Sequence, residues 1–201
     1  SIASLHRANL NITDNKNNTI IHYACASDNL DLVKYLIDLN EIDIIPKEEL
    51  STTILHSACL YGAFEIVKYI VSLQKININS QDSNYETPLH FACEHGYYEI
   101  TKYLLSLPLI EVNIQNQYGE TPLHFAIKRG YFDIVDLMLS YKNIDISLIG
   151  RNKKTYLHYS CENGNLELVK KLMKKGEFDI CAIDSDNKTL LHFACQSKNI
   201  Q

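Results

Sequence analysis

Five histidines in the sequence are each followed, three residues later, by a cysteine. The pairs are His22–Cys25, His56–Cys59, His90–Cys93, His158–Cys161 and His192–Cys195. On a helix, this spacing places both side chains on one face. An imidazole and a thiolate so arranged could bind zinc or act as base and nucleophile. These pairs are therefore candidates for metal-ligating or catalytic residues.

The same pairs recur at a fixed interval of 34 residues, and a threonine stands three residues before each histidine. The resulting pairs are Thr19/His22, Thr53/His56, Thr87/His90, Thr121/His124, Thr155/His158 and Thr189/His192. A fixed period between about 20 and 50 residues indicates a solenoid of stacked repeats. We therefore expect residues 1–201 to form one repeat domain. Its complete windows are 19–52, 53–86, 87–120, 121–154 and 155–188, with partial windows at 1–18 and 189–201.

Periodicity favours a structural role for these pairs over a chemical one. Zinc needs about four ligands converging at roughly 2.0–2.3 Å, whereas neighbouring helices pack roughly 8–10 Å apart, so equivalent residues do not converge. In the window at 121–154, Ile127 takes the place of the cysteine, which indicates an apolar core position. No phosphate-binding glycine loop or other catalytic motif is present. We expect no metal, no cofactor and no catalytic residue.

The window at 87–120 predicts two helices. Thr87 is the expected N-cap, Pro88 suits the first helical position, and His90 lies where a capping box places Glu or Gln. Leu89, Ala92 and Cys93 form an apolar helical stripe, and Gly96 is placed to end the helix.

A second helix is expected over residues 98–107. Ile110-Glu111-Val112 then alternates apolar and polar residues, which predicts a short extended segment. Gln117-Tyr118-Gly119-Glu120 is a predicted turn tip. The repeat unit is thus an antiparallel helix pair followed by a finger.

These motifs resemble the ankyrin repeat: the Thr-Pro-Leu-His quartet, the alanine at the sixth place, the glycine at the tenth, and the Tyr-Gly-Glu finger. The resemblance covers nearly the whole chain, although the family's usual period is one residue shorter. It implies an all-α solenoid, an ankyrin-repeat stack of antiparallel helix pairs with β-hairpin-like fingers. Whether the fingers at 45–52 and 147–154 form regular hairpins stays open. Both terminal windows are incomplete, so we expect the chain to be part of a longer array or of a larger protein.

Positions fixed by packing must repeat, whereas positions facing solvent need not. The eighth and ninth places of each window and the finger tips vary, as in Glu162-Asn163 and Arg151-Asn152. The resemblance implies that these places line a concave partner-binding face. The predicted partner-binding residues are Tyr61, Tyr85, Glu94, His95, Tyr118, Lys128, Arg129, Arg151 and Asn163.

Charge and hydropathy restrict the expected partners and the expected compartment. The net charge is −5, with −7 in residues 1–100 and +2 in residues 101–201, so nucleic acid is not the expected partner. No apolar run is long enough to cross a membrane, and the N-terminus lacks a signal-peptide layout. Unpaired thiols suggest a reducing compartment, the cytoplasm or the nucleus.

Three functions follow from the sequence. The leading interpretation is a non-catalytic protein–protein interaction module, a scaffold that binds a partner through first helices and finger tips. The alternative is a regulatory or tethering ankyrin segment of a larger protein, such as a kinase, channel or transcription regulator. An enzyme, the third class, would require an exposed reactive thiol. Incomplete terminal repeats also suggest end-to-end self-association.

Overall fold

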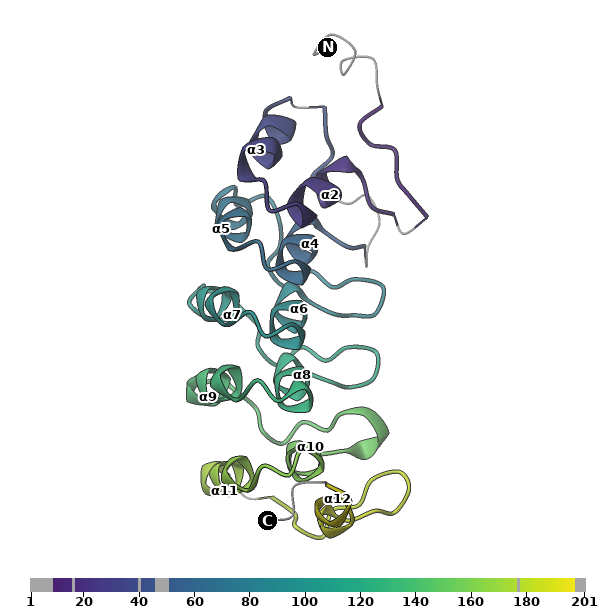
Figure 1. Ribbon diagram of the computed structural model, residues 1–201, viewed down its shortest axis with the longest axis vertical. Coiled ribbons are helices and arrows are strands. Elements are labelled where there is room, and N and C mark those ends of the chain that lie inside the picture. Colours follow the sequence, from purple (N-terminus) through teal and green to yellow (C-terminus); the bar gives the residue numbers. More distant parts are fainter. Residues whose placement is uncertain (1–8, 16, 40, 46–50, 177, 198–201) are drawn as a thin grey trace. The chain divides into compact units, whose positions relative to one another are not determined.

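The structure, a computed structural model, describes residues 9–15, 17–39, 41–45, 51–176 and 178–197. Its contacts divide the chain into two compact units, Ser1–Pro88 and Leu89–Gln201. In the first unit the helices form two pairs (Figure 1). They are α2 (Ile20–Ala26), α3 (Leu30–Asp38), α4 (Ile54–Leu60) and α5 (Phe64–Ser72). α2 packs against α3 and α4, and α5 packs against both α3 and α4.

The second unit continues the same plan. Its elements are α6 (Pro88–Glu94), α7 (Tyr98–Leu105), α8 (Pro122–Arg129), α9 (Phe132–Ser140), the 3₁₀ turn η1 (Arg151–Lys153), α10 (Tyr156–Glu162), α11 (Leu166–Lys175) and α12 (Leu190–Gln196). Here α8 packs on α9 and α10, and α10 packs on α11 and α12. The predicted all-α stack of helix pairs is confirmed, whereas the single domain and its window boundaries remain a prediction. In the described ranges, no helix is long and apolar enough to cross a membrane.

Five of the first helices, α2, α4, α8, α10 and α12, begin with the predicted threonine–histidine closure. In the windows that begin at Thr19, Thr53, Thr121, Thr155 and Thr189, the threonine N–H donates to Nδ1 of the histidine at 3.0–3.2 Å. The helix N–H of His56 in turn donates to the Thr53 hydroxyl at 3.3 Å. Because the first turn of a helix leaves N–H groups without partners, this reciprocal cap defines where each helix starts.

The second ring nitrogen links one window to the next. Nε2 of His22, His56 and His90 lies 3.0–3.1 Å from the carbonyl oxygen thirty residues later, in Thr52, Glu86 and Glu120 respectively. A backbone N–H can only donate and a carbonyl can only accept, so these contacts select the neutral imidazole that carries its proton on Nε2. We call this threonine–histidine–carbonyl connection the interrepeat link.

The apolar stripe of the first helices forms the core. Its third and sixth places are buried, at Ile21, Leu55, Leu89, Leu123 and Leu157 and at Ala24, Ala58, Ala92, Ala126 and Ser160. Small residues at the sixth place allow neighbouring first helices to approach closely. The stripe ends at α12, where Leu191 is 75% exposed.

The cysteines of the stripe are predicted to be core residues, and some of them are not buried. Cys25, Cys59 and Cys93 are buried free thiols, and burial raises the pKa of Cys25 and Cys93 to about 12. Cys161 is half-buried, and Cys195 is exposed. Cys195 belongs to α12, whose stripe the described residues leave largely uncovered.

Positive backbone φ angles occur where the sequence predicts helix ends. Gly62, Gly96, Gly130 and Gly164 have φ between 64° and 78° at the tenth place of their windows. At Gly96, an added Cβ would lie 2.7 Å from the Tyr131 ring, so this position needs glycine for space as well as for conformation. The second helix of this window ends at Leu105, two residues earlier than the sequence predicts.

The fingers are loops, and the expected extended segments are bent. In three of the apolar–polar–apolar triplets, the middle side chain accepts a backbone N–H from two residues later: Asn79 donates to Asn77, Ser147 to Asp145 and Cys181 to Asp179. Such Asx turns compete with extended backbone, which explains the difference in these three triplets. Within the described residues, the one β-bridge outside strands is Ile183 to Thr189. The tip at residues 46–50 lies outside the described residues.

Most finger tips are closed by a second Asx motif. The carboxylate or amide oxygen of Asp82, Asn116 and Asp184 accepts N–H bonds from residues two and four places later. At the equivalent place, the finger at 147–154 has Gly150, which has no side chain to accept them. Its tip instead forms η1, in which both Asn152 and Lys153 have positive φ. This finger is therefore not a regular hairpin.

The interrepeat link also changes at this finger. Nε2 of His124 has no hydrogen-bond partner among the described residues. The fully buried Tyr156 ring stacks on the imidazole instead, with centroids 3.9 Å apart, and its hydroxyl lies 2.8 Å from the Thr121 hydroxyl. Stacking and a hydroxyl contact thus replace the carbonyl connection between these two windows.

Removing the Thr121 hydroxyl should cost more stability than removing the Thr53 hydroxyl. Thr53→Ala loses a helix cap, worth on the order of 1 kcal/mol. Thr121→Ala also leaves the buried Tyr156 hydroxyl unpaired, which adds roughly 1–3 kcal/mol. Urea unfolding of both variants measures the difference, and in a Tyr156→Phe background the two costs should become equal. Lys102→Ala, an exposed change, serves as the control; an equal loss there would contradict the capping role.

Acid should destabilise the protein through its buried histidines. Burial is the main reason that the pKa falls from near 6.5 to about 4 at His56 and to about 3 at His124. The unfolded chain therefore binds protons first, and stability decreases as the pH falls from about 6.5 toward 4. For His56 this amounts to roughly 2 kcal/mol between about pH 7.5 and pH 5.

The variant His56→Gln isolates this contribution. Gln can occupy the capping-box position without titrating, so the loss of stability between the two pH values should be smaller than in the parent. The exposed His95→Gln is the matched control for the substitution itself. Parallel pH profiles for His56→Gln and the parent would show that this imidazole is not the titrating group.

Candidate functional site

The predicted partner-binding residues of the first unit are exposed side chains on two different elements. Tyr61 is the C-cap of α4 and is 55% exposed. Tyr85 is 44% exposed and lies in the finger tip with a φ of 63°. Each aromatic ring therefore presents a large contact area to solvent, as binding residues do.

In the second unit, three of the predicted residues lie at the ends of α6 and α8. Arg129 forms an ion pair with Glu94, and His95 donates from Nδ1 to the Phe91 carbonyl at 3.0 Å. Glu94 and Arg129 therefore neutralise each other at these helix ends. His95 remains exposed, with its ring nearly parallel to that of Tyr97.

Three other predicted residues, Lys128, Arg151 and Asn163, meet in one pocket of about 380 Å³. We call it the finger pocket. Its lining comes from the end of α8, from the irregular finger, and from α10 with its C-cap. The complete lining is Glu120, Lys128, Arg151, Asn152, Lys154, Tyr159, Glu162 and Asn163. Non-repeating residues from successive windows are thus brought together at one place.

A buried carboxylate lies at the base of the finger pocket. Glu120 is 2% exposed, and its Oε1 accepts from the Tyr159 hydroxyl at 2.8 Å and from Lys128 Nζ at 3.2 Å. Burial, and then the neighbouring Glu120 charge, raise the pKa of Tyr159, so the phenol keeps its proton and donates. These two donors compensate the cost of burying the Glu120 charge.

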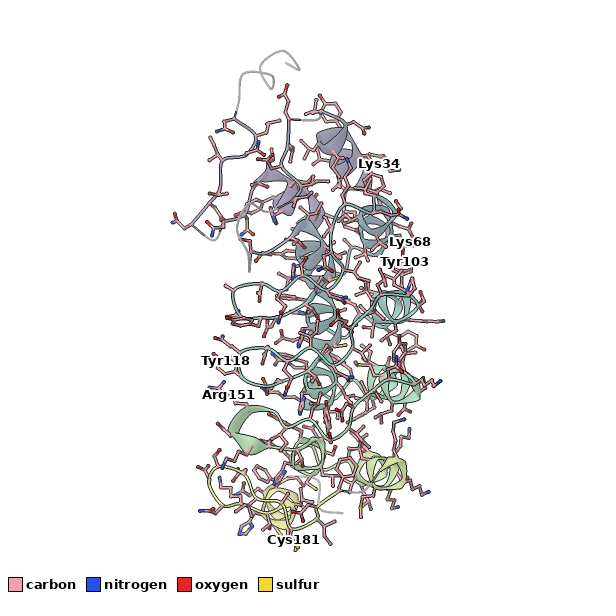
Figure 2. The ribbon with its side chains drawn as sticks, turned by 180° about the vertical axis from the view of Figure 1, so that it is seen from behind. Lys34, Lys68, Tyr103, Tyr118, Arg151 and Cys181 are labelled. Atoms are coloured by element: carbon pink, nitrogen blue, oxygen red, sulfur yellow. The ribbon has the colours of Figure 1, made fainter. Side chains whose placement is uncertain are left out.

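Arg151 holds a different position at the same pocket. Its guanidinium lies over the Tyr118 ring, 4.4 Å from the centroid (Figure 2). Among the residues that the structure describes, Arg151 has no ion pair. Because stacking occupies the face of the guanidinium, its in-plane N–H groups remain able to donate.

Lys154 completes the charged lining. Its Nζ donates to Glu162 at 2.8 Å, lies 4.5 Å from the Phe193 ring centroid and lies 5.4 Å from that of Tyr159. Asn163 donates its side-chain N–H to the Ile127 carbonyl, which ties the end of α10 to α8. The side chains around the pocket are therefore held in place before any partner binds.

Five of the lining residues are not among the predicted partner-binding residues: Glu120, Asn152, Lys154, Tyr159 and Glu162. Tyr159 occupies the fifth place, where the other windows have Tyr23, Ser57, Phe91, Phe125 and Phe193. The sequence signal that could have identified Tyr159 is its hydroxyl, because three other windows have phenylalanine at this place. Glu120 precedes the capping threonine at a variable place, and its burial by Tyr159 depends on residues 39 positions apart.

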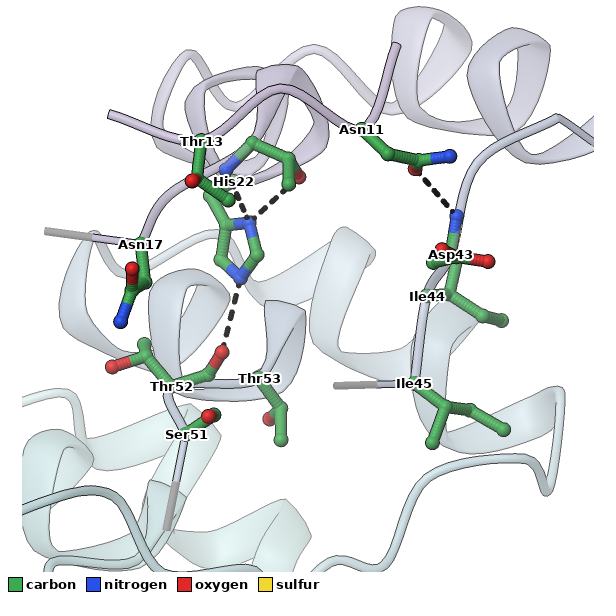
Figure 3. A pocket seen from close by; sticks show the side chains of 11 residues that line it. Asn11, Thr13, Asn17, His22, Asp43, Ile44, Ile45, Ser51, Thr52 and Thr53 are labelled. Atoms are coloured by element: carbon green, nitrogen blue, oxygen red, sulfur yellow. Dashed lines mark hydrogen bonds between the residues drawn. The ribbon is translucent and has the colours of Figure 1, made fainter. Parts of the chain in front are cut away.

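Two further pockets contain none of the predicted partner-binding residues. One, of about 240 Å³, is lined by His22, Thr52 and Asp43, and Figure 3 shows His22 engaged in the interrepeat link there. The other, of about 460 Å³, is an apolar hollow beside α10, α11 and α12 that includes Leu166, Ile180 and Leu191. Across the described part of the chain, no cluster of three or more His, Cys, Asp or Glu is arranged to hold a metal ion.

Comparison with known proteins agrees with the geometry. A family model described as ankyrin repeats (3 copies) matches three segments, residues 2–82, 71–150 and 143–201. No curated protein matches the chain. Taken with the helix pairs, the capping quartets and the closed fingers, these matches over almost the full length show that the chain belongs to the ankyrin repeat family.

Proposed function

We propose that this protein is a non-catalytic interaction module that binds a protein partner through the ends of its first helices and its finger tips. Ankyrin repeats are in general protein–protein interaction modules, and the family is typically non-catalytic. The observation that supports a binding role most strongly is the finger pocket. Residues that do not recur in the repeat line it together.

Preorganisation supports the same function. The interrepeat link and the caps fix the helix pairs, and ion pairs and cation–π contacts fix the lining of the finger pocket. Ordering flexible side chains on binding costs roughly 0.5–1.5 kcal/mol each, so a lining that is already ordered favours affinity.

We also propose an intracellular, reducing compartment, cytoplasmic or nuclear. All six cysteines are free thiols, and three of them are buried in the helix stripe. Disulfides are rare in such compartments, so free thiols are compatible with this location.

Replacing the predicted aromatic and basic residues should abolish binding of the partner. A variant with Tyr61, His95, Tyr118 and Arg129 all changed to Ala loses ring and guanidinium contacts of the kinds that dominate protein interfaces. Affinity capture from a cell lysate, followed by mass spectrometry, should lose the proteins that the parent retains.

The matched control changes Glu65, Glu99 and Lys102 to Ala on the second helices, where all three are exposed. This variant should capture the same proteins as the parent. If the four-residue variant also gives an unchanged set, the proposed binding face is wrong.

End-to-end self-association through the apolar hollow at α12 remains a prediction. Leu191 and Leu166 are 75% and 62% exposed, and exposed apolar patches promote association. Sedimentation velocity should show a mass that rises with concentration in the parent and not in Leu191→Asp. A parent that stays monomeric at every concentration contradicts this prediction.

A further inference from the structure

We propose that the finger pocket binds one carboxylate of the partner, which the partner presents to Arg151 beside Lys128 and Lys154. This inference rests on the proposed interaction function and specifies the chemistry of the partner. Three features of the second unit support it: the guanidinium of Arg151, which stacks on Tyr118 and has no ion pair within the described residues, the net charge of the pocket lining, and the irregular finger.

Arg151 is the group best placed to receive an anion. Its charge is not used in any ion pair within the described residues, and the Tyr118 ring supports its face at 4.4 Å. A guanidinium held in this way offers parallel N–H groups, which match the two oxygens of a carboxylate. Its stacking partner also reduces the rotamer freedom that binding would otherwise remove.

The charge balance of the pocket favours a single negative charge. The lining has three cations, Lys128, Arg151 and Lys154, and two carboxylates, Glu120 and Glu162, which leaves a formal charge of +1. Glu120 is buried behind Lys128, whereas Arg151 is exposed. One carboxylate would neutralise the pocket, whereas a phosphate dianion would leave an excess of negative charge beside Glu162.

The irregular finger gives an independent reason to see this pocket as a binding site. Tyr85, Gly119, Lys153 and Asn187 show that one residue with positive φ is usual at this place in the fingers. The finger at 147–154 adds a second, Asn152, at 59°. Two consecutive non-glycine residues with positive φ distinguish this tip from the other described fingers, and sparsely populated backbone conformations gather at functional sites.

The irregular finger is also held rigidly. Ser185 of the following finger donates its N–H to the Asn152 carbonyl at 2.8 Å, and Gly150 donates to the Lys154 carbonyl at 2.9 Å. The strained tip that carries Arg151 is thus fixed on both sides, as a preformed anion site requires.

The test uses small probes with the full chain. N-acetyl-glutamate N-methylamide is titrated against N-acetyl-glutamine N-methylamide, its neutral isostere, and against the phosphoserine analogue, with ¹H–¹⁵N NMR as the readout. We expect the glutamate probe to shift the Arg151 Nε–H signal and the Asn152 amide, with at least tenfold weaker binding of the glutamine probe. Equal binding of the two, tighter binding of the phosphoserine probe, or no shifts at these residues would overturn the proposal.

Two variants on one finger provide the control. Arg151→Gln should weaken the glutamate probe at least tenfold, whereas Lys153→Gln removes the same charge two residues away, outside the pocket lining, and should change binding less than twofold. Equal losses would mean that only the general charge of the finger matters, and the proposal would fail. Arg151→Lys retains the charge without the planar fork and should give an intermediate affinity.

Failure of this inference can be told apart from failure of the proposed function. If Arg151→Gln still captures the partner from a lysate while the four-residue variant at Tyr61, His95, Tyr118 and Arg129 does not, the binding face stands and the carboxylate anchor is wrong. If neither variant changes the captured set, both proposals are wrong.

Discussion

The fold depends on the neutral imidazole that joins one window to the next. Each first helix has seven or eight residues, a length that is marginal in water without tertiary contacts. At His56, Nδ1 accepts from the N-cap backbone and Nε2 reaches the Glu86 carbonyl, so a single side chain satisfies backbone groups of two windows. Local helix formation and stacking are thereby coupled, as the nearest-neighbour cooperativity of repeat proteins requires.

The window at 121–154 shows how this constraint can be relaxed. His124 keeps its cap, but Tyr156 stacks on its ring in place of a hydrogen bond at Nε2. Beside it, Gly150 removes the side chain that closes other fingers, and the tip adopts η1. The irregular finger and the charged, non-repeating residues of the finger pocket therefore lie in the same part of the second unit. A repeat protein can vary a finger without losing its core, because the stripe of Leu123, Ala126 and Ile127 remains buried there.

The regular part of the structure could be predicted from the sequence, because each regular feature recurs. Helix starts, the apolar stripe and the left-handed glycines follow from local rules and a constant period. The finger triplets were predicted as extended because apolar–polar alternation was weighed without the hydrogen bonds of their Asn and Asp side chains. In the finger pocket, Lys128, Arg151 and Asn163 were predicted as variable surface residues, but Glu120 and Tyr159 were not. Their contact spans 39 residues and appears only once the windows are stacked.

The direction of the interrepeat link has a consequence for synthesis of the chain. At His22, His56 and His90, the imidazole bonds to a carbonyl that lies thirty residues further toward the C-terminus. At a translation rate of 5–20 residues per second, the acceptor of each of these three histidines is made about 2–6 seconds after the histidine itself. An interrepeat link can therefore form only after the ribosome has synthesised the carbonyl at the end of the same window, thirty residues further along the chain. A pause in translation within one of these thirty-residue intervals would leave that imidazole without its acceptor.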